Sequence, residues 1–238
     1  SKPFFPVLAG MVATEDYTRL RNTYTRTSRY HTWVVLMLAI PAMIFSTELM
    51  HLYLDGRYDY AGGVMSILLG VTIMNALNAL GSAVALASGD MRGLSLRVII
   101  IQATNLLLTF LFVAYFEQGA YGSAYASILA VVILDIALKW PFCRRLAHTP
   151  FLYWFKETVL PTFVPAIPSF IFCLIDKLFI DINSWLMLLT VSAISAVIYI
   201  CFIVQYGLRE QDKVDLSRLS DVARVPLPLR KLLKHLAS

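Results

Sequence analysis

The chain has 238 residues, of which 58% are hydrophobic and 15% are Asp, Glu, Lys or Arg, and its net charge is +5. An average soluble domain carries about 25% charged residues, so this composition excludes a mostly water-facing surface and predicts an integral membrane protein. Cys143, Cys173 and Cys201 lie too far apart for a disulfide framework or a metal cluster, so we expect no metal and no cofactor.

The N-terminal part contains the polar stretch EDYTRLRNTYTRTSRY. If this stretch is helical, Arg19, Arg26 and Arg29 fall near one face, which predicts a helix lying on the membrane surface against anionic headgroups. A solvated loop rich in Arg is the alternative. The apolar run that follows, interrupted by Pro41, predicts a first membrane span over 31–50.

The longest uncharged run has thirty residues and predicts a second span over 61–88. About 20 residues are enough to cross the hydrocarbon core, because a helix advances about 1.5 Å per residue and satisfies its own backbone. Alanine recurs every four residues from Ala79 to Ala87, which allows a second helix to approach closely. Asn75 and Asn78 need partners that lipid does not supply, so this helix is expected inside a bundle.

Four more apolar runs predict spans over 97–116, 120–139, 158–176 and 183–207. In the fourth span Gly122, Ala126 and Ala130 again predict close helix packing. The connection before the fifth span contains Trp140 and Trp154, which are expected at headgroup depth.

Three prolines lie on one face of the fifth span. Pro165 and Pro168 are hinge candidates, because each removes a helix hydrogen bond, whereas Pro161 is expected to begin a helix.

Lys and Arg distribute unequally between the two sides of a six-span arrangement. With a cytoplasmic N-terminus, 18 of the 20 fall inside and only Arg57 and Lys177 fall outside. This bias predicts that both termini, including a basic tail over 209–238, are cytoplasmic. It also explains the positive net charge without a nucleic-acid partner. The PLPLRKLLKHL segment of the tail either rests on the inner leaflet or is disordered.

Ionisable residues inside spans are expensive and therefore mark candidate functional positions. Asp135 precedes Lys139 by four residues, which predicts either a structural ion pair or a protonatable group that couples transport to a gradient. Glu48 is interpreted as a carboxylate at the outer end of the first span, with a coupling role as the alternative.

Amides are better candidates for the wall of a polar cavity, because they hydrogen-bond sugar hydroxyls without carrying charge. The candidates are Asn75, Asn78, Gln102 and Asn105. Hydrogen bonding between helices is the alternative role. The middle of each predicted span lacks Arg and Lys, so a diphosphate would have to be held at the inner rim, by Arg92, Arg97 and Lys139, or by another lobe.

Four stretches together resemble a known transporter family: EDYTRLRNTYTRTSRY, LYLDGRYDYAGGVMSILLG, ALASGDMRGLSLRVIIIQATNLLLTF and QGAYGSAYASILA. From about Pro3 to Leu146 the chain resembles the C-terminal half of polysaccharide-biosynthesis transporters. These are O-antigen-type flippases of the superfamily that also contains multidrug extrusion transporters. The resemblance implies an all-α bundle of six transmembrane helices, one lobe of a two-lobed alternating-access transporter.

The resemblance also implies a function and a location. The protein is expected in the bacterial inner membrane, carrying a polyprenyl-diphosphate-linked oligosaccharide from the cytoplasmic to the periplasmic leaflet for lipopolysaccharide O-antigen or other polysaccharide biosynthesis. Its implied partners are the lipid bilayer, the N-terminal lobe of the same full-length protein and polysaccharide polymerase or assembly proteins.

Two alternatives come from different functional classes. A multidrug-type cation antiporter belongs to the same superfamily, and a membrane-embedded glycan polymerase or transferase would act on similar lipid-linked sugars. The predicted outside connections over 51–59, 117–119 and 176–181 are short for a catalytic site, and HExxH, GxSxG and P-loop motifs are missing from the sequence. We therefore expect a transporter and not an enzyme, with no catalytic residues.

Overall fold

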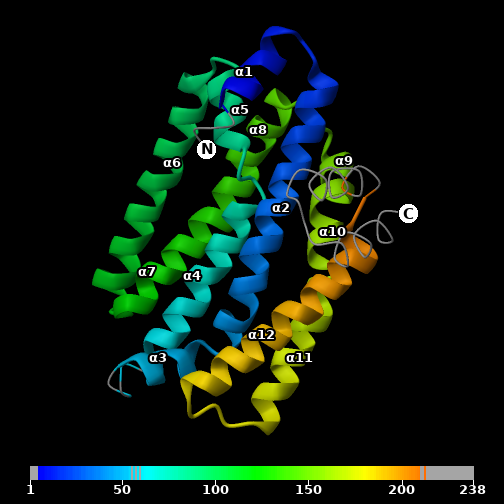
Figure 1. Ribbon diagram of the computed structural model, residues 1–238. Helices are drawn as coiled ribbons and strands as arrows, with labels where there is room; N and C mark the ends of the chain where they lie inside the picture. The colour runs from blue at the N-terminus through cyan, green and yellow to red at the C-terminus, as the bar shows by residue number, and fades with distance from the viewer. Residues whose placement is uncertain (1–4, 55, 57, 59, 210–211, 213–238) are drawn as a thin grey trace.

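A computed structural model describes residues 5–54, 56, 58, 60–209 and 212 of the chain (Figure 1). Apart from Arg209 and Asp212, the tail over 209–238 lies outside these residues, and so does its amphipathic segment.

All regular secondary structure in the described residues is helical. The α-helices are α1 (Phe5–Ala13), α2 (Tyr17–Ile44), α3 (Ser46–Leu54), α4 (Tyr60–Ala76), α5 (Gly81–Ala87), α6 (Met91–Phe110), α7 (Gly119–Leu129), α8 (Trp140–Leu146), α9 (Phe151–Trp154), α10 (Leu160–Phe163), α11 (Ala166–Phe179) and α12 (Trp185–Phe202). Four segments widen into π-helix, namely η2 (Leu111–Tyr115), η3 (Ala130–Lys139), η4 (Phe155–Val159) and η5 (Ile203–Gly207).

Five continuous or nearly continuous helical stretches are long and apolar enough to cross a membrane: Tyr60–Ala87, Met91–Tyr115, Gly119–Leu146, Phe151–Phe179 and Trp185–Gly207. The pair α2 and α3 supplies a sixth if the two are counted as one span, although they meet at a bend of 73°. For the described residues, the predicted all-α class with helices long and apolar enough to span a membrane is thus confirmed. Each predicted span falls within one of these stretches or within the bent pair, or extends past it by at most two residues.

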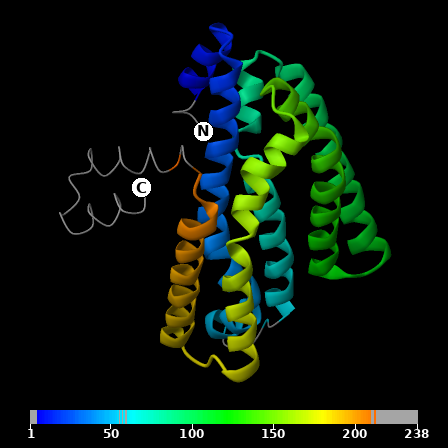
Figure 2. The same cartoon turned by 90° about the vertical axis from the view of Figure 1, so that its right-hand side faces the viewer.

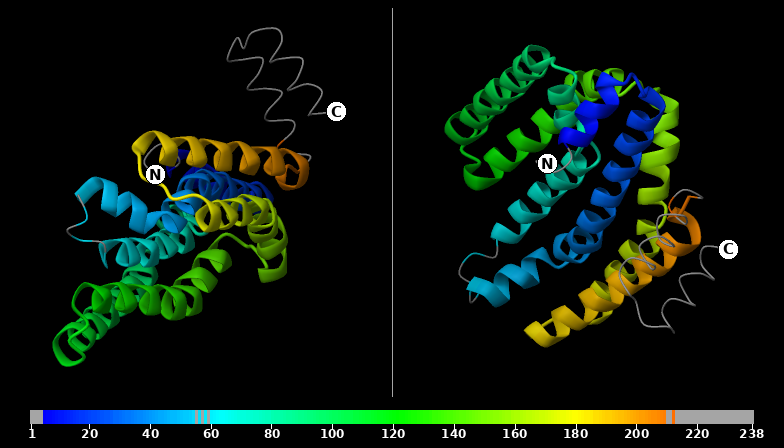
Figure 3. Two further views of the ribbon diagram at one scale, coloured as in Figure 1. Left: turned by 90° about the horizontal axis from the view of Figure 1, so that it is seen from below. Right: turned by 45° about the horizontal axis from the view of Figure 1, so that its top comes forward.

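Helix α2 lies at the centre of the arrangement and contacts α4, α11 and α12. Figure 2 shows α12 on one side of α2 and the pair α6 and α7 on the other side, with α11 and α4 between. One hydrophobic cluster joins α2 to α11 and α12 around Leu36, Ile40 and Tyr199. A second cluster joins α1, α2, α5 and α8 around Leu8, Tyr24 and Trp140. The view from below in Figure 3 shows α6 and α7 splayed away from the α11–α12 pair.

The polar stretch before the first span is helical, so the loop interpretation was wrong, and its helix continues directly into the first span. It forms the first half of α2, which begins where the Asp16 side chain accepts a hydrogen bond from the Arg19 backbone N–H at 3.0 Å. Leu20, Tyr24 and Arg29 are buried against other helices. Tertiary contacts therefore draw this polar stretch into the bundle.

The predicted connection before the fifth span is largely helical, and only residues 147–150 separate α8 from α9. The helix of the fourth span continues through η3 and α8 to Leu146, and Pro141 is accommodated in the first turn of α8. Trp140 and Trp154 are buried with ring centroids 5.2 Å apart, and do not lie at an exposed interface. The two indole rings instead hold α8 against α9 inside the protein.

Close packing of the small residues in the fourth span is confirmed. Gly122, Ala126 and Ala130 are buried. A Cβ atom added to Gly122 would lie 2.9 Å from the backbone carbonyl carbon of Phe112, so only glycine allows this approach of α7 to η2.

Three of the helical stretches are interrupted. α2 bends into α3 at Phe45, four residues after Pro41, whose ring has no N–H to donate. The second span is interrupted between Ala76 and Gly81, and the fifth between Phe163 and Ala166. These breaks place irregular backbone within lengths of chain that are long enough to cross a bilayer.

Candidate functional site

The four amides predicted for a cavity wall do not gather in one place. Asn75 and Gln102 are exposed on the outside of the bundle. Asn105 is half-buried, and its Oδ1 accepts a hydrogen bond from the Thr109 hydroxyl of the same helix at 3.2 Å. These three amides lie on α4 and α6, which both contact α7 and η3. The amides are therefore spread around α7 and η3.

Asn78 lies in the break between α4 and α5 and is buried. Its Oδ1 accepts a hydrogen bond from the Tyr24 hydroxyl at 2.7 Å, which joins the break to α2. Its Nδ2 is buried without a hydrogen-bond partner among the described residues. The geometry matches the alternative role that the sequence left open, a hydrogen bond between helices, and leaves the two N–H donors of the amide unused.

Asp135 and Lys139 form the ion pair that their spacing predicted, with 2.9 Å between Oδ2 and Nζ. Asp135 is buried in η3, and Lys139 lies one turn closer to the end of the span. A buried carboxylate needs such a partner, because an isolated charge in this environment is strongly unfavourable.

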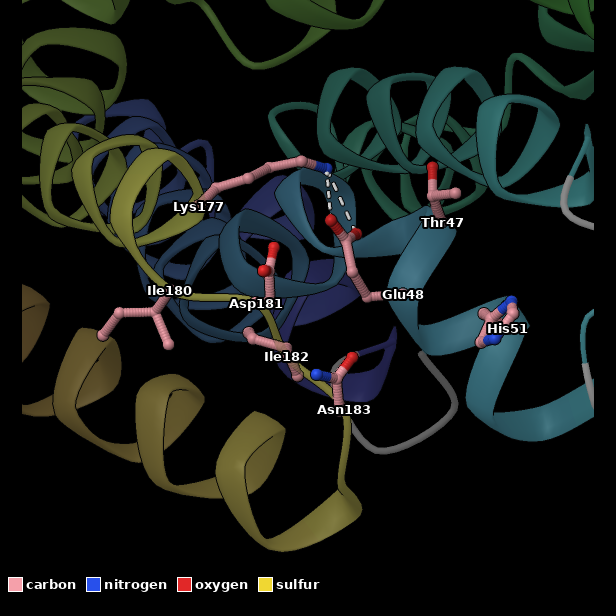
Figure 4. Close-up of a pocket in the computed structure, with 8 residues that line it drawn as sticks. All are labelled: Thr47, Glu48, His51, Lys177, Ile180, Asp181, Ile182 and Asn183. Atoms are coloured by element: carbon pink, nitrogen blue, oxygen red, sulfur yellow. Dashed lines mark hydrogen bonds and ion pairs between the residues drawn. The ribbon is translucent and has the colours of Figure 1, made fainter.

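Glu48 lines a pocket at the end of the bundle where α3, α11 and the connection to α12 meet (Figure 4). The pocket has a volume of about 290 Å³ and is lined by Thr47, Glu48, His51, Lys177, Ile180, Asp181, Ile182 and Asn183. Figure 4 shows the Glu48 and Lys177 side chains pointing toward each other across it.

The Lys177 ammonium lies 3.0 Å from Oε1 of Glu48 and also donates a hydrogen bond to the Ile44 carbonyl at 2.6 Å. This second bond caps a carbonyl at the bend between α2 and α3. The sequence missed the pair because 129 positions separate its members, although both were expected at the outer ends of spans. The pocket offers carboxylate, ammonium and amide groups that can bind water or hydroxyl groups.

The three basic residues expected at the inner rim do not form one site. Arg92 is exposed at the start of α6. Arg97 donates to the Gly93 carbonyl at 2.7 Å, and its guanidinium lies 4.0 Å from the ring centroid of Phe142. Lys139 is engaged by Asp135.

A different group of arginines does gather, in what we call the arginine pocket. It has a volume of about 190 Å³ and is lined by Asn22, Thr25, Arg26, Arg29, Tyr153, Glu157 and Arg209. These residues come from α2, from α9 and η4, and from the chain just after η5. Sequence reasoning missed this pocket because its members are up to 187 positions apart. The placement of Arg26 and Arg29 near one face of a helix was the local signal for it.

Arg29 is the most deeply placed charge of this group, with a side chain only 3% exposed. Its Nη2 forms an ion pair with Asp212, which is 1% exposed, and its Nη1 donates to the Glu157 carbonyl at 2.6 Å. Asp212 also accepts hydrogen bonds from the Tyr30 hydroxyl at 2.5 Å and from the Arg209 backbone N–H at 2.8 Å. The segment after the last span is thereby tied to the first one.

The two hinge candidates take different positions. Pro165 is buried in the break between α10 and α11, directly before the first residue of α11. Pro168 lies in the first turn of α11, where a missing N–H costs no hydrogen bond. The position of the break thus coincides with Pro165.

Within the described residues, no three His, Cys, Asp or Glu side chains lie close enough together to hold a metal ion. Comparisons with protein-family models, with curated proteins and with solved structures find no match to this chain. The contacts and exposures described above, and the sequence resemblance, therefore carry the functional argument.

Proposed function

We propose that this chain is one lobe of a two-lobed membrane transporter that moves a polyprenyl-diphosphate-linked oligosaccharide from the cytoplasmic to the periplasmic leaflet. The observation that carries the proposal is the exposure of Asn75 and Gln102. Each lies more than ten residues from either end of its helical stretch, a depth of about 15 Å in a bilayer.

An amide at that depth does not face lipid without cost, because hydrocarbon offers it no hydrogen bond. A water-filled passage or a second lobe would supply the missing partners. Helix α6 is also poorly covered, since only 6% of the apolar part of the Met91–Tyr115 stretch is buried. Such low burial is expected if the bundle is incomplete. Apolar residues of α6 suit lipid, whereas Gln102 suits a polar passage.

The helix breaks add support. Transporters place substrate and ion sites at discontinuous helices, where freed backbone groups and polar side chains meet. Here the break in the second span carries Asn78, and the break in the fifth carries Pro165. A polar headgroup crossing the membrane needs such interruptions in an otherwise apolar slab.

The experiment uses the full-length protein in cells that depend on it for surface polysaccharide. We expect Asn75→Leu and Gln102→Leu to lower surface polysaccharide at unchanged protein level, because each removes a hydrogen-bonding group from the passage. Leu106→Ala is the matched control, since Leu106 is 72% exposed on the same helix as Gln102 and apolar. Normal polysaccharide in both amide variants would remove these residues from a transport path.

A further inference from the structure

The arginine pocket combines three features of an anion-binding site. First, charge is unbalanced: Arg26, Arg29 and Arg209 line it, whereas Glu157 is its one acidic lining residue. Asp212 adds a second carboxylate, but it is held behind Arg29 by the contacts described above. Among the described lining residues, three arginines therefore surround one carboxylate.

Second, the guanidinium groups of Arg29 and Arg209 are not saturated, although Nη2 of Arg209 donates to the Lys156 carbonyl at 2.9 Å. Glu157 approaches Arg29 Nη1 at 3.9 Å and Arg209 Nε at 3.6 Å, which is too long for a hydrogen bond. The buried Nε atoms of Arg29 and Arg209 have no hydrogen-bond partner within the described part of the chain. Buried donors of this kind are rarely left unpaired in proteins, so their presence around a cavity points to a missing acceptor.

Third, the remaining lining residues suit a tetrahedral oxyanion. Tyr153, Asn22 and Thr25 add hydroxyl and amide groups, and the Tyr153 hydroxyl already donates to Asn22 at 3.0 Å. Arg21 stacks over the Tyr153 ring at 4.6 Å and adds a further positive charge nearby. Several arginines from different helices around one cavity are the arrangement that binds phosphate with both charge and direction.

The position of the pocket relative to the membrane-length helices indicates the source of the phosphate. Tyr153 and Glu157 lie in the first two turns of the Phe151–Phe179 stretch, and Arg209 lies two residues beyond the Trp185–Gly207 stretch. The pocket is therefore at the end of two membrane-length helices, where lipid headgroups are found. It is on the side that the distribution of Lys and Arg assigns to the cytoplasm, where anionic headgroups are abundant.

We propose that the arginine pocket binds the phosphate group of an anionic phospholipid headgroup. Binding at this place would join α2, η4 and the segment after η5 through one ligand, next to the ion pair that already connects them. The proposal does not depend on the transport function, because it concerns a lipid of the surrounding bilayer.

The test is native mass spectrometry of the whole chain purified in detergent, with three separate probes: phosphatidylglycerol, phosphatidylcholine and inorganic phosphate. We expect phosphatidylglycerol to be retained in preference to phosphatidylcholine. Arg26→Gln and Arg209→Gln should each weaken this retention about tenfold, the loss expected for one charge-assisted hydrogen bond. Arg92→Gln is the matched control, because Arg92 is an exposed arginine outside the pocket.

Three outcomes would overturn the proposal. They are equal retention of the two lipids, equal retention of phosphatidylglycerol by the pocket variants and by Arg92→Gln, and arginine-dependent binding of inorganic phosphate without any lipid preference. Melting temperatures of all variants are measured in parallel. Arg29 is left intact because its removal would leave Asp212 buried without its cation, and a folding defect would then imitate a loss of binding.

Discussion

Arg29 and Asp212 form a buried ion pair, and each needs the other to remain charged inside the protein. Each loses its hydration inside the protein, and the attraction between them, together with the hydrogen bonds from Tyr30 and Arg209, offsets that loss. Replacing one partner leaves the other as an isolated buried charge. Their role in stability is therefore larger than that of a surface ion pair.

We expect Asp212→Ala to destabilise the protein by about 3–5 kcal/mol, the usual effect of removing one member of a buried pair. The measurement is thermal unfolding in detergent, followed by tryptophan fluorescence. Asp181→Ala is the control, because Asp181 is exposed at the opposite end of the bundle. Equal melting temperatures for the two variants would contradict the burial of Asp212.

Gly62 is a second single residue with a clear structural role, because only glycine fits at its contact between α4 and α3. A Cβ atom added there would lie 2.6 Å from Cα of Thr47, and backbone atoms do not move aside easily. Gly70 is eight residues further along the same helix, and a Cβ atom added there would meet only the Ile128 side chain at 3.9 Å.

We expect Gly62→Ala to destabilise the protein by about 1–3 kcal/mol, since it forces α3 and α4 apart. Gly70→Ala should be neutral or stabilising by up to about 1 kcal/mol, because alanine favours a helix more than glycine does. Thermal unfolding of the two variants under one condition measures the difference. Equal destabilisation would show that α3 and α4 are not in contact at Gly62.

At the scale of elements, the fifth span is the clearest interrupted helix. Four segments, α9, η4, α10 and α11, follow one another over Phe151–Phe179, and the break falls at Pro165. The ring of Pro165 removes one backbone donor, whereas Pro168 lies in a turn that needs none. Bending at this place is consequently expected to depend on Pro165 more than on Pro168.

We expect Pro165→Ala to narrow the range of angles between the two halves of the span, because it restores a helix hydrogen bond. Spin labels at Leu152 and Leu178, both exposed, would report this as a narrower distance distribution in pulsed electron paramagnetic resonance. The exposed Cys201 is replaced by serine in this experiment. Pro168→Ala is the control and should leave the distribution unchanged. Identical distributions in the two variants would remove Pro165 as a hinge.

At the scale of the whole molecule, the six predicted crossings determine which ends of the helices share a side. One crossing, Tyr60–Ala87, separates α3 from the start of α6. We expect Tyr53→Cys to react with an impermeant maleimide in intact cells and Arg92→Cys to react only after permeabilisation. Both side chains are exposed in the structure, so accessibility within the fold is matched. Labelling of both from one side would contradict the six-span topology.

The sequence by itself determined the helical class, the approximate positions of the membrane-length stretches and the Asp135–Lys139 pair. Hydropathy acts over about 20 neighbouring residues, and an i,i+4 pair needs one helical turn, so both are local properties of the chain. Tertiary structure alone decided the burial of Trp140 and Trp154, the Glu48–Lys177 pair and the arginine pocket. These depend on which helix faces meet, and residue spacing does not specify contacts between positions more than a hundred residues apart.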